Sequence, residues 1–335
     1  MTRAVTNLAL SCVAVGAALA LLRAAPAEAA GMNWVQTFVS NTGSDANPCN
    51  EPAVACGSIA RALSQTAVGG EVTVLTAGLY GLTGIVINQS VYISNDGAGE
   101  ATLKTFDVPF VGITINAGAG AVVGLRGLAI DGFFSGPQGI HIDQASAVHI
   151  QNCVIRNFED PGSGYGIALQ PVGSTQLFVS DTLIYNNGSS AGTGGIYIGP
   201  TDTGSANVVL DRVHLENNVV GLLVDGFHGN PTGAHVVIRD SVVSGNASHG
   251  IQARSAPTGA PAFLVVERTA VVNNAGTGIL AGGPHATMLL DGNVVARNGV
   301  GISAASSGQL ITYGNNRVNN NLGADGAPTG SYSPI

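Results

Sequence analysis

The chain has 335 residues, of which 48 are glycine, 45% are hydrophobic and 10% are charged. This composition is too apolar for a disordered chain and too rich in glycine for a helical protein. The formal charge is −8, which argues against nucleic acid as a partner, because neutralising phosphates requires a basic surface.

Residues 1–30 have the pattern of a secretory signal peptide. Arg3 precedes an uncharged apolar stretch over residues 8–22, and Ala27, Glu28 and Ala29 supply the small-residue spacing of a cleavage site. The apolar stretch is shorter than the roughly 20 residues of a membrane span, and an uncleaved N-terminal anchor is the alternative. We therefore expect a secreted or periplasmic protein with no membrane span once the signal peptide is removed.

Residues 31–70 are predicted to hold a first strand, a cysteine loop and a short capping helix. Cys49 and Cys56 lie in one irregular segment, NPCNEPAVAC, where they are expected to form a disulfide in an oxidising compartment. No metal is expected here, because no histidine or further cysteine lies nearby to complete a tetrahedral site. Ser58 can act as the N-cap of a helix within residues 56–66.

Residues 71–325 contain a repeat in which a glycine is followed by a short apolar strand. The repeat has a spacing of 22 to 29 residues and starts at Gly84, Gly112, Gly139, Gly166, Gly195, Gly221, Gly250, Gly278, Gly301 and Gly323. Each unit holds three strands that are too short to pair within a turn, so they must pair with the equivalent strands above and below. The repeat predicts an all-β fold, a single-stranded right-handed parallel β-helix of about ten rungs. Residues 326–335 are predicted to be a polar tail.

Two columns of polar residues follow the same period. The first places an asparagine before the next glycine, at Asn187, Asn218, Asn246, Asn274, Asn298 and Asn320. Asparagine tolerates a left-handed turn, and stacked amides can hydrogen-bond from turn to turn. The second is a charged corner, at Asp181, Asp211-Arg212, Arg239-Asp240 and Glu267-Arg268. Opposite charges on neighbouring strands support the register, so we interpret both columns as structural.

The segments TFVSNTGSDANPC and AVGGEVTVLTAGLY and the glycine-led repeats up to residue 320 resemble the exported right-handed β-helix proteins of the pectin-lyase-like superfamily. The resemblance implies the fold but no single activity, because this superfamily includes pectate lyases, polygalacturonases, alginate epimerases, phage tailspikes and adhesin-like proteins. The Asp pair, Gly-His-Gly and Arg-Ile-Lys segments of polygalacturonases are missing from the sequence. Pectate-lyase-like chemistry would require an acidic calcium cluster and a strong base, whereas this chain has one lysine, Lys104, and no acidic cluster along one rung. We therefore expect no cofactor, and calcium only if the chain is a lyase.

The outer face of the GIxIx strands is the predicted location of a functional site. The first and third residues after each glycine are expected to point inward, so that the second and fourth face solvent. The resemblance implies that this face is the sugar cleft. Polar and aromatic residues at the outward positions gather between Asn116 and Arg254, which places the candidate site on the middle turns.

Two pairs on this face are candidate catalytic residues. His141 and Asp143 share one strand, as a general base and its acid partner could, and Asp225 and Arg254 lie on adjacent turns. For both pairs the alternative is a solvated or ion-paired surface. The candidate ligand-binding residues are Asn116, Gln170, Tyr197 and Gln252. Among them Tyr197 could stack on a sugar ring, with packing across neighbouring strands as the alternative.

Three hypotheses about function follow from the sequence. The favoured one is an exported β-helix that binds a polysaccharide or cell-surface glycan on the GIxIx strands, without evident catalysis. The second is a polysaccharide lyase, glycoside hydrolase or epimerase, and the third is a structural or adhesin-like surface protein. The acidic charge disfavours substrates rich in uronate, since their carboxylates would be repelled.

Overall fold

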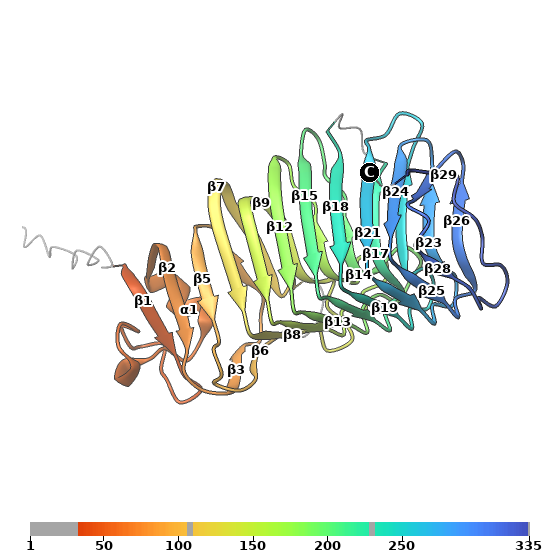
Figure 1. The fold of residues 1–335 in the computed structure, drawn as a ribbon. Helices are drawn as coiled ribbons and strands as arrows, with labels where there is room; N and C mark the ends of the chain where they lie inside the picture. Colours follow the sequence, from red (N-terminus) through yellow and green to blue (C-terminus); the bar gives the residue numbers. More distant parts are fainter. Residues whose placement is uncertain (1–32, 106–109, 228–231, 334–335) are drawn as a thin grey trace, which may run out of the picture. The chain divides into compact units, whose positions relative to one another are not determined.

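The computed structural model describes residues 33–105, 110–227 and 232–333. The predicted signal peptide, residues 1–30, lies outside the described residues. Within them, parallel strands stack turn upon turn from β1 (Trp34–Val39) to β29 (Gly330–Ser331) (Figure 1). No helix in these ranges is long and apolar enough to cross a membrane.

A typical turn contributes one strand to each of three faces. The first face consists of the GIxIx strands, which are β4 (Ile85–Ile87), the first half of β7 (Ile113–Arg126), the first half of β9 (Gln138–Gln151), β11 (Tyr165–Leu169), β14 (Gly194–Ile198), β17 (Val220–Gly226), β20 (Ile251–Ser255), β23 (Thr277–Gly282) and β26 (Val300–Ala305). The second face consists of β1, β2 (Thr66–Val74), β5 (Val91–Ser94), the second halves of β7 and β9, β12 (Ser174–Ser180), β15 (Ser205–Asp211), β18 (Ala234–Arg239), β21 (Ala262–Glu267), β24 (Ala286–Asp291), β27 (Gln309–Thr312) and β29.

The third face is a separate sheet of ten strands. These strands are β3 (Gly78–Gly81), β6 (Ala101–Lys104), β8 (Leu128–Asp131), β10 (Val154–Arg156), β13 (Leu183–Tyr185), β16 (His214–Glu216), β19 (Val242–Ser244), β22 (Ala270–Val272), β25 (Val294–Ala296) and β28 (Arg317–Val318). The first and second faces instead form one 19-stranded sheet, because β7 and β9 run through both. The predicted coil of about ten turns with three strands in each is therefore confirmed in outline.

The repeated glycine is required at the tight corner where each GIxIx strand begins. A Cβ atom at Gly166 would lie 2.5 Å from Cγ2 of Ile184 and 2.7 Å from the carbonyl oxygen of Gly195 in the next turn. No larger residue fits at this distance. The isoleucines that follow the glycine, such as Ile140 and Ile167, are fully buried, and they form one continuous apolar core along the coil.

The N-terminal end carries the predicted disulfide and the predicted helix. Cys49 and Cys56 are bonded, and a 3-10 helix, η1 (Pro52–Val54), lies in the loop between them. The helix α1 (Ile59–Gln65) begins after Ser58, whose Oγ accepts a hydrogen bond from the Arg61 amide at 3.1 Å. Ile59, at the start of α1, is fully buried in the core of the coil, so the helix covers the apolar end of the first turns.

The C-terminal segment closes the other end of the coil. The Gly301 amide donates to the carbonyl oxygen of Ala324 at 2.8 Å, and the Thr329 amide donates to that of Leu310 at 2.8 Å. Within the stretch predicted to be a polar tail, residues 330 and 331 form β29, which pairs with β27. This segment therefore continues the hydrogen bonding of the last turn.

The asparagine column is a ladder of buried amides, with one correction to the sequence prediction. The amide ladder consists of Asn187, Asn218, Asn246, Asn274, Asn298 and Asn321. The last turn was predicted to contribute Asn320, but Asn320 is the left-handed residue, with φ 58°, and Asn321 accepts from Asn298 Nδ2 at 3.0 Å. The left-handed turn and the amide ladder are thus two adjacent positions, which the prediction had merged into one.

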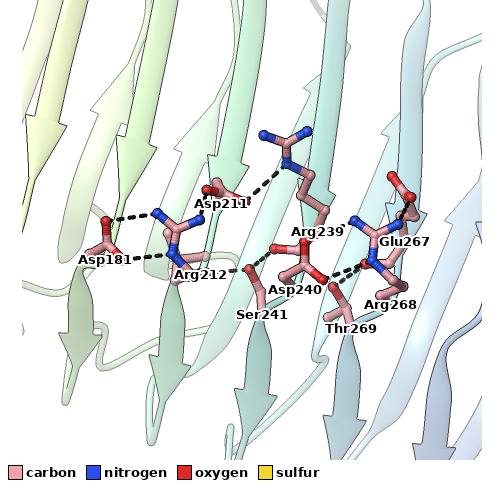
Figure 2. Close-up of polar contacts among 10 residues, drawn as sticks. Asp181, Asp211, Arg212, Arg239, Asp240, Ser241, Glu267, Arg268 and Thr269 are labelled. Carbon is pink, nitrogen blue, oxygen red and sulfur yellow. Dashed lines mark hydrogen bonds and ion pairs between the residues drawn. The ribbon is translucent and has the colours of Figure 1, made fainter.

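The charged corner forms ion pairs between turns, as predicted. Figure 2 shows Arg212 between Asp181 and Asp211, with Nε 2.7 Å from Asp181 Oδ1. Two turns further along the coil, Nε of Arg268 lies 2.8 Å from Oδ1 of Asp240. We call this row of exposed pairs the charge ladder. Its guanidinium and carboxylate groups are paired with one another, which supports the structural interpretation.

Candidate functional site

The outer side of the first face is divided into an open part and a covered part. At the second position after the glycine, Thr114, His141, Ala168, Tyr197, Leu223, Gln252, Leu280 and Ser303 follow one another from turn to turn. Thr114 and His141 are partly exposed, whereas Ala168, Tyr197 and Leu223 are buried. The prediction that this whole column faces solvent is therefore wrong for the middle turns.

His141 and Asp143 form a hydrogen-bonded pair on the open part of the face. Both project outward from β9, and Nε2 of His141 lies 2.7 Å from Oδ1 of Asp143. Their side chains are 19% and 36% exposed, so a ligand in solution could reach them. The other imidazole nitrogen, Nδ1, is buried and has no hydrogen-bond partner among the described residues.

Two of the three predicted amide ligands, Asn116 and Gln170, lie near this pair, although Asn116 is displaced in register. Gln170 follows β11, the next strand of the face, and is partly exposed. Asn116 is exposed, but the register shifts after Ile115, so Asn116 pairs with Gln144 in place of Asp143. The irregularity moves Asn116 out of the column that the simple repeat predicts.

A second apolar cluster covers the middle turns from the outside. Tyr197, Val220 and Leu223 are its buried members, and Tyr165 packs against them. The ring centroids of Tyr165 and Tyr197 are 5.0 Å apart. Only 6% of Tyr197 is exposed, so of its two expected roles, stacking on a sugar and packing across strands, the structure shows the packing. Burial raises the pKa of its hydroxyl above the ordinary value, so this tyrosine remains neutral.

Glycine at position 199 lets the Tyr197 hydroxyl reach the next turn. A Cβ atom at Gly199 would lie 2.4 Å from that hydroxyl. Gly199 follows β14 at the position that Asp225 has one turn later. Because no side chain stands there, the Tyr197 hydroxyl can donate to Oδ2 of Asp225 at 3.1 Å.

Asp225 and Arg254 are paired across adjacent turns, as predicted. Nη2 of Arg254 donates to Oδ2 of Asp225 at 2.7 Å, and Oδ1 of Asp225 accepts from the Phe227 amide at 3.0 Å. The Asp225 side chain is only 3% exposed, against 36% for Arg254. Burial alone would lower the pKa of Arg254, but the bond to Asp225 outweighs it and raises that pKa. Asp225 is thus enclosed by its partners, which disfavours a role as an accessible acid.

Arg254 is held from a second side by an aromatic ring. Its guanidinium carbon lies 5.2 Å from the centroid of the Phe227 ring, within the range of a cation–π contact. Gln252, two residues earlier on β20, is also partly exposed. Asp225, Arg254 and Gln252 form a smaller polar area on the C-terminal side of the apolar cluster. Among the described residues, no three His, Cys, Asp or Glu side chains come together as a metal site.

Sequence reasoning missed Tyr165 and Phe227. Tyr165 precedes its glycine, where the chain bends and the alternation of inward and outward positions is interrupted. Phe227 follows β17 in a loop. Their positions in the sequence could have indicated them. Tyr165 directly precedes a GIxIx strand, and Phe227 lies two residues after the candidate residue Asp225.

Comparison with known protein families identifies the fold. A family model described as "Right handed beta helix region" matches residues 85–259 and 225–327. These ranges together span most of the chain, which therefore belongs to this family of right-handed β-helix proteins. The predicted handedness and the predicted resemblance to pectin-lyase-like proteins are confirmed. A search of curated proteins found no match.

Solved structures show the same architecture at low sequence identity. Pectate lyase Pel9A is 15% identical with a TM-score of 0.54, and the match covers 85% of this chain and 79% of that chain. An alginate lyase from Paenibacillus sp. str. FPU-7 is 14% identical with a TM-score of 0.50, covering 89% and 97%. The tailspike protein 2 of an Escherichia coli O157:H7 bacteriophage is 14% identical with a TM-score of 0.51, covering 79% and 37%. At these identities the likeness shows the fold alone.

Proposed function

We propose that this chain binds a polysaccharide or cell-surface glycan on the open part of the first face. The observation that carries the proposal is the hydrogen-bonded pair of His141 and Asp143, whose side chains are partly exposed on the outer side of the coil. A sugar hydroxyl can donate to the partly exposed carboxylate of Asp143. The rigid sheet holds these polar groups in place without a ligand, which reduces the entropy cost of binding.

The surroundings of His141 support a saccharide ligand. Asn116 and Gln170 offer amide donors and acceptors on the same side of the coil. Tyr165 adds a partly exposed aromatic surface on β11, the strand that pairs with the β9 strand of His141. A few polar groups around an aromatic surface are typical of small-molecule sites. Two proteins of this fold are a pectate lyase and an alginate lyase, which favours the same ligand class.

The disulfide supports a location outside the cytoplasm. The bond between Cys49 and Cys56 would persist in an oxidising compartment and is rare in a reducing one. We therefore propose a secreted or periplasmic protein, consistent with the signal peptide predicted for residues 1–30. A glycan of a cell wall or extracellular matrix would be within its reach.

Catalysis at His141 is the second candidate function. The 2.7 Å contact to Asp143 would orient the imidazole, and the partly exposed Asp143 carboxylate could exchange a proton with a sugar substituent. The enclosed carboxylate of Asp225 does not favour a second catalytic group at that position. An acid–base reaction would therefore depend on His141 and Asp143.

The test is a comparison of binding and turnover with one set of glycans. The purified mature protein would be run in native gels that contain neutral or uronate polysaccharides, with and without calcium. The same mixtures would be assayed for unsaturated products and new reducing ends. We expect retardation by at least one glycan without turnover, whereas product formation that His141→Ala abolishes would establish the catalytic alternative.

Two site variants and one control variant locate the site. His141→Ala and Gln170→Ala should each reduce the retardation. Ser303→Ala removes a polar side chain from the column of His141, near the C-terminal end of the coil, and should leave it unchanged. Absence of retardation by every glycan, or full retardation of His141→Ala, would contradict the proposed site.

A further inference from the structure

The second face carries a groove that the proposed site does not use. The groove has a volume of about 290 Å³ and is lined by Glu71, Tyr92, Asp96, Arg126, His149 and Gln151, among others. These residues come from β2, β5, β7 and β9 and the turn after β5. They lie on the outer side of the second face, whereas His141 lies on the first.

The floor of the groove is an exposed tyrosine that occupies the place of a missing side chain. Tyr92 on β5 pairs with Gly124 on β7, and a Cβ atom at Gly124 would lie 2.3 Å from Cδ1 of the Tyr92 ring. The ring therefore leans along the coil over Gly124. Despite this contact it remains 46% exposed. A large aromatic residue that is fixed in position and still open to solvent is suited to contact a ligand.

His149, which lines the groove, stacks on the aromatic ring of the next turn. His149 follows Gly124 in the same column, and Phe178 follows His149. The rings of His149 and Phe178 are nearly parallel, with an interplanar angle of 10° and centroids 4.8 Å apart. Stacking on Phe178 restricts the His149 ring, so Tyr92 and His149 are two aromatic surfaces held one turn on either side of Gly124.

Polar groups that pair with one another surround these rings. Nε of Arg126 lies 2.7 Å from Oδ1 of Asp96, and the Ser94 hydroxyl donates to Oε1 of Glu71. The carboxylates and the guanidinium can accept from and donate to hydroxyl groups of a ligand. Glu71, Asp96 and Arg126 together carry a net charge of −1, which disfavours a carboxylated ligand.

We propose that this groove, which we call the Tyr92 site, binds a hexose or hexosamine residue of a glycan. The C–H face of a pyranose ring would contact the Tyr92 ring, and its hydroxyls would reach Glu71 and Arg126. A protonated amino sugar would gain attraction from Glu71, whereas a uronate would be repelled. The Tyr92 site lies on a different face from the proposed His141 site and does not depend on it.

The experiment measures saccharide affinity by calorimetric titration of the full mature chain with neutral, amino and uronate oligosaccharides. Tyr92→Ala removes the ring. Gly124→Ala keeps the tyrosine in the sequence but forces its ring away from the position above residue 124. We expect each to weaken binding of a neutral or amino oligosaccharide about tenfold. Val237→Ala, in the same column but beyond the groove, should bind like the unmodified chain. Thermal melts would confirm that all variants are folded.

Three results would overturn the Tyr92 site. The first is that no neutral or amino oligosaccharide binds at millimolar concentration. The second is that the affinity is unchanged in both Tyr92→Ala and Gly124→Ala. The third is that His141→Ala removes the binding, because the ligand would then lie on the first face, which would support the proposed function alone.

Discussion

The amide ladder and the charge ladder both connect successive turns, but they differ in burial. The asparagine side chains from Asn187 to Asn298 are 0 to 1% exposed, whereas side chains of the charge ladder such as Arg212 and Arg268 are 55% and 51% exposed. A buried amide that loses its partner has no water to replace it, whereas an exposed ion has. The two ladders therefore look alike in the repeat but should contribute very differently to stability.

Each amide of the buried ladder also binds the backbone. Oδ1 of Asn246 accepts from the Asn218 amide at 2.9 Å, and its Nδ2 donates to Oδ1 of Asn274 at 2.7 Å and to the carbonyl oxygen of Leu215 at 3.2 Å. One side chain thus links three turns. The Asp225–Arg254 pair is intermediate between the ladders, because one partner is buried and the other is one-third exposed.

The largest effect is expected from Asn246→Ala, which interrupts the amide ladder at its centre. The buried backbone N–H of Asn218 loses its acceptor, and the free energy of unfolding should fall by about 2 to 3 kcal/mol. Urea denaturation measures this change. As a control, Asn217→Ala alters the left-handed asparagine that precedes Asn218, with φ 55°, and should cost only about 1 kcal/mol. Equal losses in the two variants would remove the distinction between the ladder and the turn.

Arg254→Ala should have the next largest effect, since it leaves Asp225 buried with an uncompensated charge. Removing one partner of a fully buried pair costs about 3 to 5 kcal/mol, and the partial exposure of Arg254 reduces the expected loss to about 2 kcal/mol. Denaturant unfolding tests this value. Gln252→Ala, on the same strand, should change stability by less than about 0.5 kcal/mol. An unchanged stability of Arg254→Ala combined with weaker glycan retardation would instead make Arg254 a ligand contact.

The half-buried His249 provides a test by pH. Burial lowers its pKa below the ordinary value of 6.5, and its Nδ1 accepts a hydrogen bond from the Thr277 amide at 3.1 Å. The folded chain therefore favours the neutral imidazole. This contribution is complete above pH 6.5 and is lost as the pH falls through the lower folded pKa.

Thermal melts across this pH range should show the loss for the natural chain. His249→Asn removes the titrating group and should flatten that part of the profile. A profile that is equally steep in the variant would assign the pH dependence to other groups.

The coil could be predicted from the sequence because its requirements recur in every turn. The corner that excludes a Cβ atom at Gly166 and the inward isoleucines are repeated, so each turn supports the interpretation of the next. The sequence prediction assigned Asn320 to the amide ladder in place of Asn321, because Asn319, Asn320 and Asn321 are consecutive. Residue type alone cannot tell which of three asparagines points inward.

The candidate site was less predictable because its exposure depends on contacts outside the repeat. Alternation correctly placed His141, Asp143 and Asp225 on the outer side of the coil. It could not show that Tyr165 packs over Tyr197, or that the register shifts at Asn116, because both follow from local irregularities. The repeat therefore predicts the direction of a side chain, whereas its accessibility depends on the neighbouring turns.

The smallest effect is expected from Arg239→Ala in the charge ladder. Nε of Arg239 lies 3.0 Å from Oδ1 of Asp211, and the Arg239 side chain is 46% exposed. Asp211 keeps its second partner, Arg212, so no isolated charge is left. The free energy of unfolding should fall by less than about 0.5 kcal/mol, and the difference should shrink further at high salt, because exposed charges are screened. Denaturation at low and high salt measures both quantities, and a loss as large as that of Asn246→Ala would show that burial does not separate the two ladders.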